Sequence, residues 1–238
     1  RGAGCNATQF RPAACIIGEP SHWDGVTLGY KGRLLVEYRL TRPCSHSAGP
    51  GPSAPEQVSS WWENVKRRVR ELNGARTSPF EIVQATLRTI NTSSDGLYDR
   101  VHAVVSFRIP LHVLPDQLEQ ICREEAERLD DSGQEPGDAR AEVTAAGSEV
   151  AYKSPRDTGL VRAFTTAIRR HGATPHLRVK TGTSDMNIVG PIWQCPIVAY
   201  GPGDSRLDHT PNEHISISEY HKAVEVLTDV IERVAGEV

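Results

Sequence analysis

The amino-acid sequence predicts an α/β protein into which a second α/β unit, with two layers, is inserted. From residue 26 to about residue 147, strand-like and helix-like segments follow the order β-α-β-β-α-β, the split βαβ or ferredoxin-like pattern. The segments on either side alternate strands with helices, as an α/β domain does. We therefore predict one domain from residues 1–24 and 151–238 and an inserted domain at 25–150.

The inserted domain begins at residues 26–41, which alternate apolar and polar side chains as a long strand does, with a bend at Gly29 or Gly32. An apolar stripe at helical spacing then predicts a helix at 56–72 that ends at Asn73-Gly74. The remaining predicted elements are two strands, a helix that starts near a proline, and a last strand: 81–90, 98–109, 114–129 and 139–147.

The flanking domain has a short apolar strand at 13–18 that stops before Pro20 and leaves Glu19 at its end. Open α/β sheets bind their ligands at the carboxyl ends of strands, so Glu19 has a functional position. The rest of this domain is predicted as a helix, a strand, a turn, a strand and a terminal helix: 157–172, 176–180, 181–187, 195–201 and the residues after Ser216. Ser216 and Glu219 have the spacing of a capping box for the terminal helix.

Composition excludes several classes of protein. The chain has 238 residues, 38% hydrophobic residues and a net charge of −3, and no apolar run approaches the length of a membrane span. This balance does not favour nucleic acid or an anionic membrane as a partner. Its five cysteines form no C-x-x-C pair, which argues against a zinc knuckle or a disulfide framework and favours a cytoplasmic protein with reduced thiols.

Several residues have the chemistry of a site, but each by itself is more typical of a solvated surface. Besides Glu19, residues 203–217 ("GDSRLDHTPNEHISI") contain His209, which follows Asp208, and His214. The turn "KTGTSDMN" (180–187) offers the hydroxyls of Thr183 and Ser184 to an anionic group, and the loop "PCSHSAGP" (43–50) presents His46. The basic run at 66–72 is either a solvated helix face or a docking surface for an acidic partner.

Taken together, the segments "IIGEPS", "TLGYKGRLLVEYRL", "SHSAGP", "KTGTSDMN" and "YGPGDSRLDHTPNEHI" resemble, in this order, the dizinc amidohydrolase and exopeptidase superfamily. Its members include acetylornithine deacetylase, succinyl-diaminopimelate desuccinylase and the carboxypeptidase-like aminoacylases. Within this superfamily, the sequences of these segments are most similar to the LysW-lysine hydrolase, or N-acetyl-lysine deacetylase, branch. The resemblance covers essentially the whole chain.

The resemblance implies a zinc-exopeptidase-like α/β catalytic domain and an inserted lid that forms a homodimer. By motif match, Glu19 would bind one zinc and His209 the other. The catalytic His46 would reach into the partner subunit's site and polarise the scissile carbonyl. Arg108 would bind the substrate carboxylate, with Asn91, Thr183 and Ser184 as further contacts. The implied reaction is hydrolysis of an amide by a metal-activated water, with zinc or cobalt as the metal. It would release lysine or ornithine, in lysine or arginine biosynthesis, from an acyl group or an acidic amino-group carrier protein.

The sequence departs from this family in its metal ligands. It contains no H-x-D motif, and the family's zinc-bridging aspartate and adjacent glutamate pair are missing from it. We therefore expect the chain to be about the C-terminal two-thirds of such an enzyme, to bind zinc weakly or not at all, and to be inactive alone. The alternative is a binding or dimerisation module of the same ancestry that does not catalyse a reaction.

Overall fold

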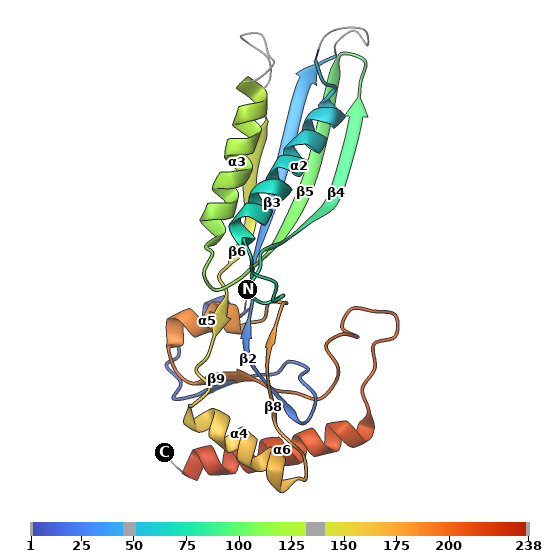
Figure 1. Cartoon of the computed structure of the whole chain (residues 1–238). Helices are drawn as coiled ribbons and strands as arrows, with labels where there is room; N and C mark the ends of the chain where they lie inside the picture. Colours follow the sequence, from blue (N-terminus) through green and yellow to red (C-terminus); the bar gives the residue numbers. More distant parts are fainter. Residues whose placement is uncertain (1, 45–50, 132–140, 237–238) are drawn as a thin grey trace. The chain divides into compact units, whose positions relative to one another are not determined.

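A computed structural model of the chain describes residues 2–44, 51–131 and 141–236 (Figure 1). The chain forms two compact units, Arg1–Lys31 with Ala151–Val238, and Gly32–Val150. In the described residues, no helix is both long and apolar enough to cross a membrane.

The first unit is built on a five-stranded mixed sheet with the order β1-β9-β2-β7, in which β8 also pairs with β2. β1 runs parallel to β9, and β8 runs parallel to β2. Its elements are α1 (Gly2–Ala7), β1 (Cys15–Ile17), β2 (Gly25–Tyr30), β7 (Tyr152–Lys153), α4 (Gly159–Arg170), β8 (His176–Lys180), α5 (Met186–Trp193), β9 (Ile197–Ala199) and α6 (Ile217–Gly236).

Helices cover both faces of this sheet. Val198 and Tyr200 pack with α4 and α6, and the ring centroid of Tyr200 lies 4.7 Å from that of Phe164. The alternate residues, Ile197 and Ala199, pack on the opposite face with Met186 of α5. The unit is therefore an α/β layer structure, with the sheet between two helical layers.

The structure corrects the predicted strand at 26–41, because the strand is interrupted at Lys31. All six residues of β2 are buried, as in a central strand covered on both faces. At Gly29 the register of β2 against β8 shifts, and a Cβ there would lie 2.7 Å from the carbonyl oxygen of Tyr152. β2 therefore belongs to the first unit, and the boundary lies between residues 31 and 32 rather than 24 and 25.

The second unit has the chain order β-α-β-β-α-β, with an antiparallel sheet in the order β4-β5-β3-β6. Its elements are β3 (Gly32–Pro43), α2 (Ala54–Asn73), β4 (Gln84–Ser94), β5 (Tyr98–Ile109), α3 (Pro115–Asp131) and β6 (Glu142–Glu149). In β3, buried residues alternate with more exposed ones, since α2 and α3 cover one face of the sheet (Figure 1). Trp61 of α2 is fully buried there, and its indole nitrogen donates to the carbonyl oxygen of Cys122 at 2.9 Å.

Candidate functional site

The candidate site lies at one edge of the first unit's sheet, where the parallel strands β1 and β9 end. Beyond the strands the two chain segments stay paired, because the backbone N–H of Ser21 donates to the carbonyl oxygen of Gly201 at 2.8 Å. The next contact is from the backbone N–H of His22 to the carbonyl oxygen of Gly203, at 3.0 Å. Glu19 and the loop that leads from Gly203 to His209 therefore start from the same edge, where α/β sheets bind ligands.

The backbone around Glu19 is held from several sides. Its N–H donates to the carbonyl oxygen of Ile17 at 3.0 Å, and the ammonium group of Lys180 donates to the carbonyl oxygen of Pro20. Gly201 passes so near that a Cβ there would lie 3.0 Å from the carbonyl oxygen of Glu19. A side chain at this position would force the two segments apart by a few tenths of an ångström, so Gly201 favours this close packing against Glu19.

Charged groups from the turn after β8 and the loop after β9 act on the carboxylate of Glu19, as does Lys180 at the end of β8. Burial raises the pKa of Glu19, with Lys180 opposing this shift and Asp208 and Asp185 adding to it, while His209 also opposes it. Burial lowers the pKa of Lys180, against the attraction of Asp208 and Glu19. The site is thus a half-buried group of acids around one ammonium, in which Glu19 keeps a proton to a higher pH than a solvated glutamate.

Tyr30, at the end of β2, adds a buried polar group to this edge. Burial raises the pKa of Tyr30, and the charge of Glu19 is the next contribution. The side chains of Ser184 and Thr27 lie close enough to its hydroxyl to oppose this shift in the pKa. Tyr30 therefore adds a buried phenol to this edge, beside the charge of Glu19.

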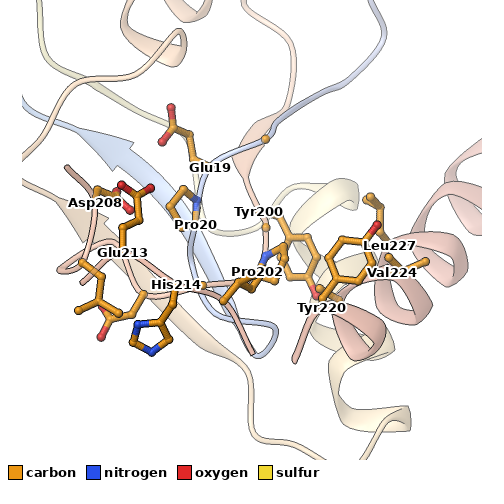
Figure 2. A pocket seen from close by; sticks show the side chains of 17 residues that line it. Glu19, Pro20, Tyr200, Pro202, Asp208, Glu213, His214, Tyr220, Val224 and Leu227 are labelled. Atoms are coloured by element: carbon orange, nitrogen blue, oxygen red, sulfur yellow. The ribbon is translucent and has the colours of Figure 1, made fainter. Parts of the chain in front are cut away.

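A cavity of 640 Å³ opens beside Glu19 (Figure 2). Glu19, Asp208, Glu213 and His214 provide its polar residues near the loop, whereas α6 provides an apolar side. That side is lined by Tyr220, Ala223, Val224 and Leu227. The cavity therefore combines carboxylates with an apolar surface, as ligand sites commonly do.

His209 lies in the loop after β9, and its side chain is exposed. Its backbone has a φ of 61°, and its N–H donates to Oε2 of Glu213 at 3.0 Å. His214, to which the family resemblance assigns no role, lines the cavity, with its Nδ1 2.7 Å from the carbonyl oxygen of Asn212. Of the two histidines, only His214 is among the cavity-lining residues.

Thr183 and Ser184 lie in the turn between β8 and α5. The hydroxyl of Ser184 accepts the backbone N–H of Met186 at 3.2 Å, and its own N–H donates to the side chain of Asn187 at 2.9 Å. Ser184 therefore helps to begin α5. Its neighbour Asp185 makes no capping hydrogen bond from its side chain, and its charge acts on Glu19.

Arg108 and Asn91 belong to the second unit and lie at different points of its sheet. Arg108 faces Arg33 of β3, and its pKa is lowered by burial and by the charges of Arg33 and Arg88. Asn91 faces His102 on β5, six residues from Arg108, which is a separation of about 20 Å along the strand. Within one copy of the chain, one small amino acid would not contact both side chains, so their shared role stays a prediction for the dimer. His46 lies outside the described residues.

The basic residues of α2 are largely matched by acids. Lys66 lies 2.6 Å from Glu63, and Arg67 lies 2.9 Å from Glu71. Arg68 bridges to Glu124 and Glu125 of α3, each at 3.2 Å. An acidic partner would have to compete with these pairs, which favours the interpretation of 66–72 as a solvated helix face.

The residues described at this edge do not fit a complete zinc site. The resemblance assigns Glu19 to one zinc and His209 to the other. Across residues 2–44, 51–131 and 141–236, no group of three or more His, Cys, Asp or Glu side chains is arranged to hold a metal ion. Structural and catalytic zinc sites use three or four protein ligands, so Glu19 and His209 alone do not supply one.

Sequence reasoning missed Lys180 and misassigned Glu219. Lys180 ends β8, and its position at a strand end was the signal available. Glu219 was predicted to complete a capping box, and its N–H does donate to the hydroxyl of Ser216 at 3.4 Å. Its carboxylate instead accepts the backbone N–H groups of Trp23 and Gly203, so the reciprocal half of the box is absent.

Comparison with known proteins gives a consistent family. The model of peptidase family M20/M25/M40 matches residues 3–233. The [LysW]-lysine hydrolase of Deinococcus radiodurans is 41% identical, over 99% of this chain and 63% of its own length. A putative [LysW]-lysine/[LysW]-ornithine hydrolase of Thermococcus kodakarensis is 38% identical, over 95% of this chain and 56% of its own length.

Solved structures show the same fold. An M20 family metallo-carboxypeptidase from Sulfolobus solfataricus, Sso-CP2, superposes with a TM-score of 0.72 at 16% identity, covering 97% of this chain and 65% of that protein. The chain thus spans less than two-thirds of the length of these relatives. With a family model that matches nearly all of its residues, the chain belongs to peptidase family M20/M25/M40.

Proposed function

We propose that this chain forms part of a metal-dependent amidohydrolase that releases lysine or ornithine from a carrier protein or an acyl group. The observation that carries the proposal is the placement of Glu19 and the His209 loop at the ends of two parallel strands beside a 640 Å³ cavity. The identity of 41% to a protein named [LysW]-lysine hydrolase supports the choice of substrate.

In this proposal Glu19 and His209 each contribute one ligand to a pair of metal ions. The remaining ligands come from residues other than those that the structure describes. The chain alone is then expected to bind zinc weakly and to be inactive. Arg108 would bind a substrate carboxylate through its guanidinium, since arginine suits bidentate contact with a carboxylate. The second unit would act as a lid and dimerise through the edge strand β4, whose residues from Arg88 onward are all exposed.

The test uses the protein expressed from the whole reading frame that contains this chain, purified with zinc. Release of free lysine and ornithine is measured from the carrier-linked and the N-acetylated amino acid. Glu19→Gln and His209→Ala should each lower kcat/KM by about 100-fold or more, because each removes a proposed metal ligand. Glu225→Ala, on the exposed side of α6, is the matched control and should retain activity. Full activity of both site variants would refute the assignment.

The exposed β4 edge and the lack of a metal-binding cluster in the described residues favour one alternative, a dimerisation module without catalysis. The two functions differ in the same assay. A dimer by light scattering, with neither zinc nor hydrolysis in the whole protein, would support the module. Stoichiometric zinc with release of lysine would support the hydrolase.

A further inference from the structure

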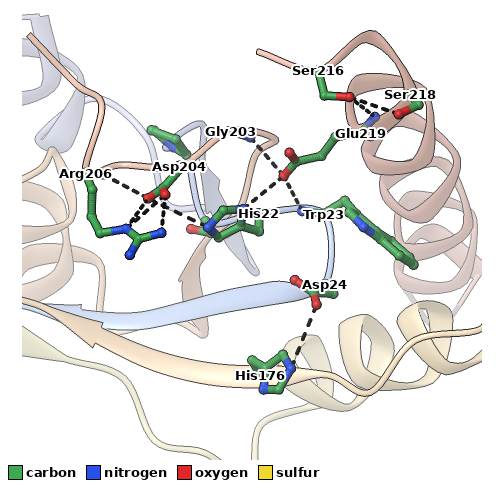
Figure 3. Close-up of polar contacts among 12 residues, drawn as sticks. His22, Trp23, Asp24, His176, Gly203, Asp204, Arg206, Ser216, Ser218 and Glu219 are labelled. Carbon is green, nitrogen blue, oxygen red and sulfur yellow. Dashed lines mark hydrogen bonds and ion pairs between the residues drawn. The ribbon is translucent and has the colours of Figure 1, made fainter. Parts of the chain in front are cut away.

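The carboxylate of Glu219, in the first turn of α6, joins two loops that are far apart in the sequence (Figure 3). Its Oε1 accepts the backbone N–H of Trp23 at 3.1 Å and the backbone N–H of Gly203 at 3.1 Å. The side chain is only 19% exposed, so both hydrogen bonds are partly shielded from water. Hydrogen bonds to a charged acceptor are stronger than those between neutral groups.

These two loops are the ones that lead to the candidate site. Trp23 lies four residues after Glu19, and Gly203 begins the loop that contains Asp208 and His209. The same loops are already paired through the backbone of His22 and Gly203. One side chain from a third element therefore fixes both segments at the point from which the site residues extend.

Both loops have left-handed backbone conformations next to this carboxylate, at His22 and at Gly203. His22 has a φ of 63°, which is unfavourable for a residue with a side chain, whereas the φ of 98° at Gly203 is one that glycine adopts readily. In this conformation the ring of His22 lies between two acids, with Nδ1 3.3 Å from Glu219 and Nε2 3.7 Å from Asp204. Strained backbone beside a site is retained where the surroundings determine it, and here Glu219 contacts both His22 and Gly203.

Asp204 extends the network along the second loop. It contacts Arg206, whose guanidinium nitrogen lies 2.6 Å from Oδ2, and this hydrogen bonding holds the pKa of Asp204 well below its usual range. The chain of contacts thus runs from α6 through Glu219 and His22 to Asp204 and Arg206. It ends two residues before Asp208.

We propose that Glu219 is a positioning residue that sets the placement of the Glu19 loop relative to the His209 loop. It does not touch the reacting atoms; it acts through the backbone of Trp23 and Gly203. The effect on catalysis rests on the proposed function, whereas the effect on the two loops does not.

The first experiment measures hydrogen exchange of the Trp23 and Gly203 amides by NMR in this chain. Glu219→Ala should speed exchange at both amides by at least about tenfold, because a hydrogen bond to a charged group is lost. Glu219→Gln should speed exchange less than Glu219→Ala does, since its amide oxygen still accepts both N–H groups but carries no charge. Glu225→Ala is the matched control, because Glu225 is another α6 glutamate beside a histidine, 3.5 Å from His171.

A shorter side chain covers the case in which Glu219→Ala does not fold. Glu219→Asp keeps the charge but cannot reach both amides, so it should also speed exchange at Trp23 and Gly203 by about tenfold. Unchanged exchange in both Glu219→Ala and Glu219→Asp would overturn the proposal. So would an equal increase across the whole first unit, which would indicate general destabilisation instead of a local contact.

The second experiment measures steady-state kinetics in the protein from the whole reading frame. Glu219→Ala should lower kcat by about 10- to 100-fold with KM changed less than threefold, because misplaced loops impair the reaction more than binding. Glu219→Gln should restore kcat to within threefold of the parent protein. Normal kcat in Glu219→Ala would overturn the catalytic part. If the parent protein itself releases no lysine, the proposed function fails, and amide exchange still decides whether Glu219 positions the loops.

Discussion

The two sheets of this protein are built from strands of different kinds. In the second unit, β3 and β5 are each 12 residues long and pair in register over their whole length. In the first unit, β1 and β9 have three residues each, yet the candidate site lies where they end. The long strands hold themselves together through their own ladder, whereas the short ones depend on contacts from loops and from α6. The geometry of the site is therefore fixed mainly by side chains that lie outside its strands.

The largest predicted effect tests whether each unit is stabilised by its own core. Trp61→Ala should destabilise the second unit by about 3–5 kcal/mol, since it removes a fully buried ring system. The ring centroids of Trp61 and Tyr38 lie 4.7 Å apart. Denaturant unfolding followed by hydrogen exchange in peptides of each unit should show the loss in residues 32–150 only.

The matched control is Leu97→Ala, at a position that is 73% exposed, which should change stability by less than about 0.5 kcal/mol. Equal loss of protection in both units after Trp61→Ala would show that they unfold together. It would contradict the prediction that each unit is stabilised by its own core.

The same contrast explains which features the sequence could predict. Regular spacing of Val58, Trp61 and Val65 predicts α2, and alternation predicts β3, because these patterns come from burial on one face. In contrast, β2 is buried on every residue, so its pattern does not distinguish it from the start of β3. The predicted strand therefore ran through Lys31, and the domain boundary was placed too early.

The site was only partly predictable for a different reason. Glu19 was identified because a proline ends its strand, which is a local signal. The contacts of Glu219 with Trp23 and of Lys180 with Pro20 join residues 196 and 160 positions apart, and no local pattern encodes such a pairing. The capping-box spacing at Ser216 was a local signal too, but tertiary contacts redirected its glutamate.

A second variant tests the tight packing that the short strands require. Gly29→Ala should destabilise the first unit by about 1–3 kcal/mol, because its Cβ would lie 2.7 Å from the Tyr152 carbonyl oxygen and 2.9 Å from Cα of Lys153. Thermal unfolding and peptide-level exchange measure this change. Gly182→Ala is the control, since a Cβ there meets nothing within 4 Å. Equal effects of the two substitutions would contradict the role given to close packing at β2.

The smallest predicted effect concerns the charge at the site and depends on pH. Burial raises the pKa of Glu19 above its ordinary value of 4.5, so the folded state holds this proton more tightly than the unfolded state does. Its contribution to stability is full below that value and is lost as the pH rises through the raised pKa.

Glu19→Gln carries no charge, and should therefore be more stable than the parent chain at pH 7–8, with the gain disappearing at about pH 4 and below. Thermal unfolding across this range measures the difference, and Glu232→Gln, at an exposed position of α6, is the control. A Glu19→Gln variant that is less stable at pH 8 than at pH 4, relative to the parent, would show that attraction to Lys180 outweighs burial. The charged form of Glu19 would then stabilise the folded state, and its pKa would be lowered instead of raised.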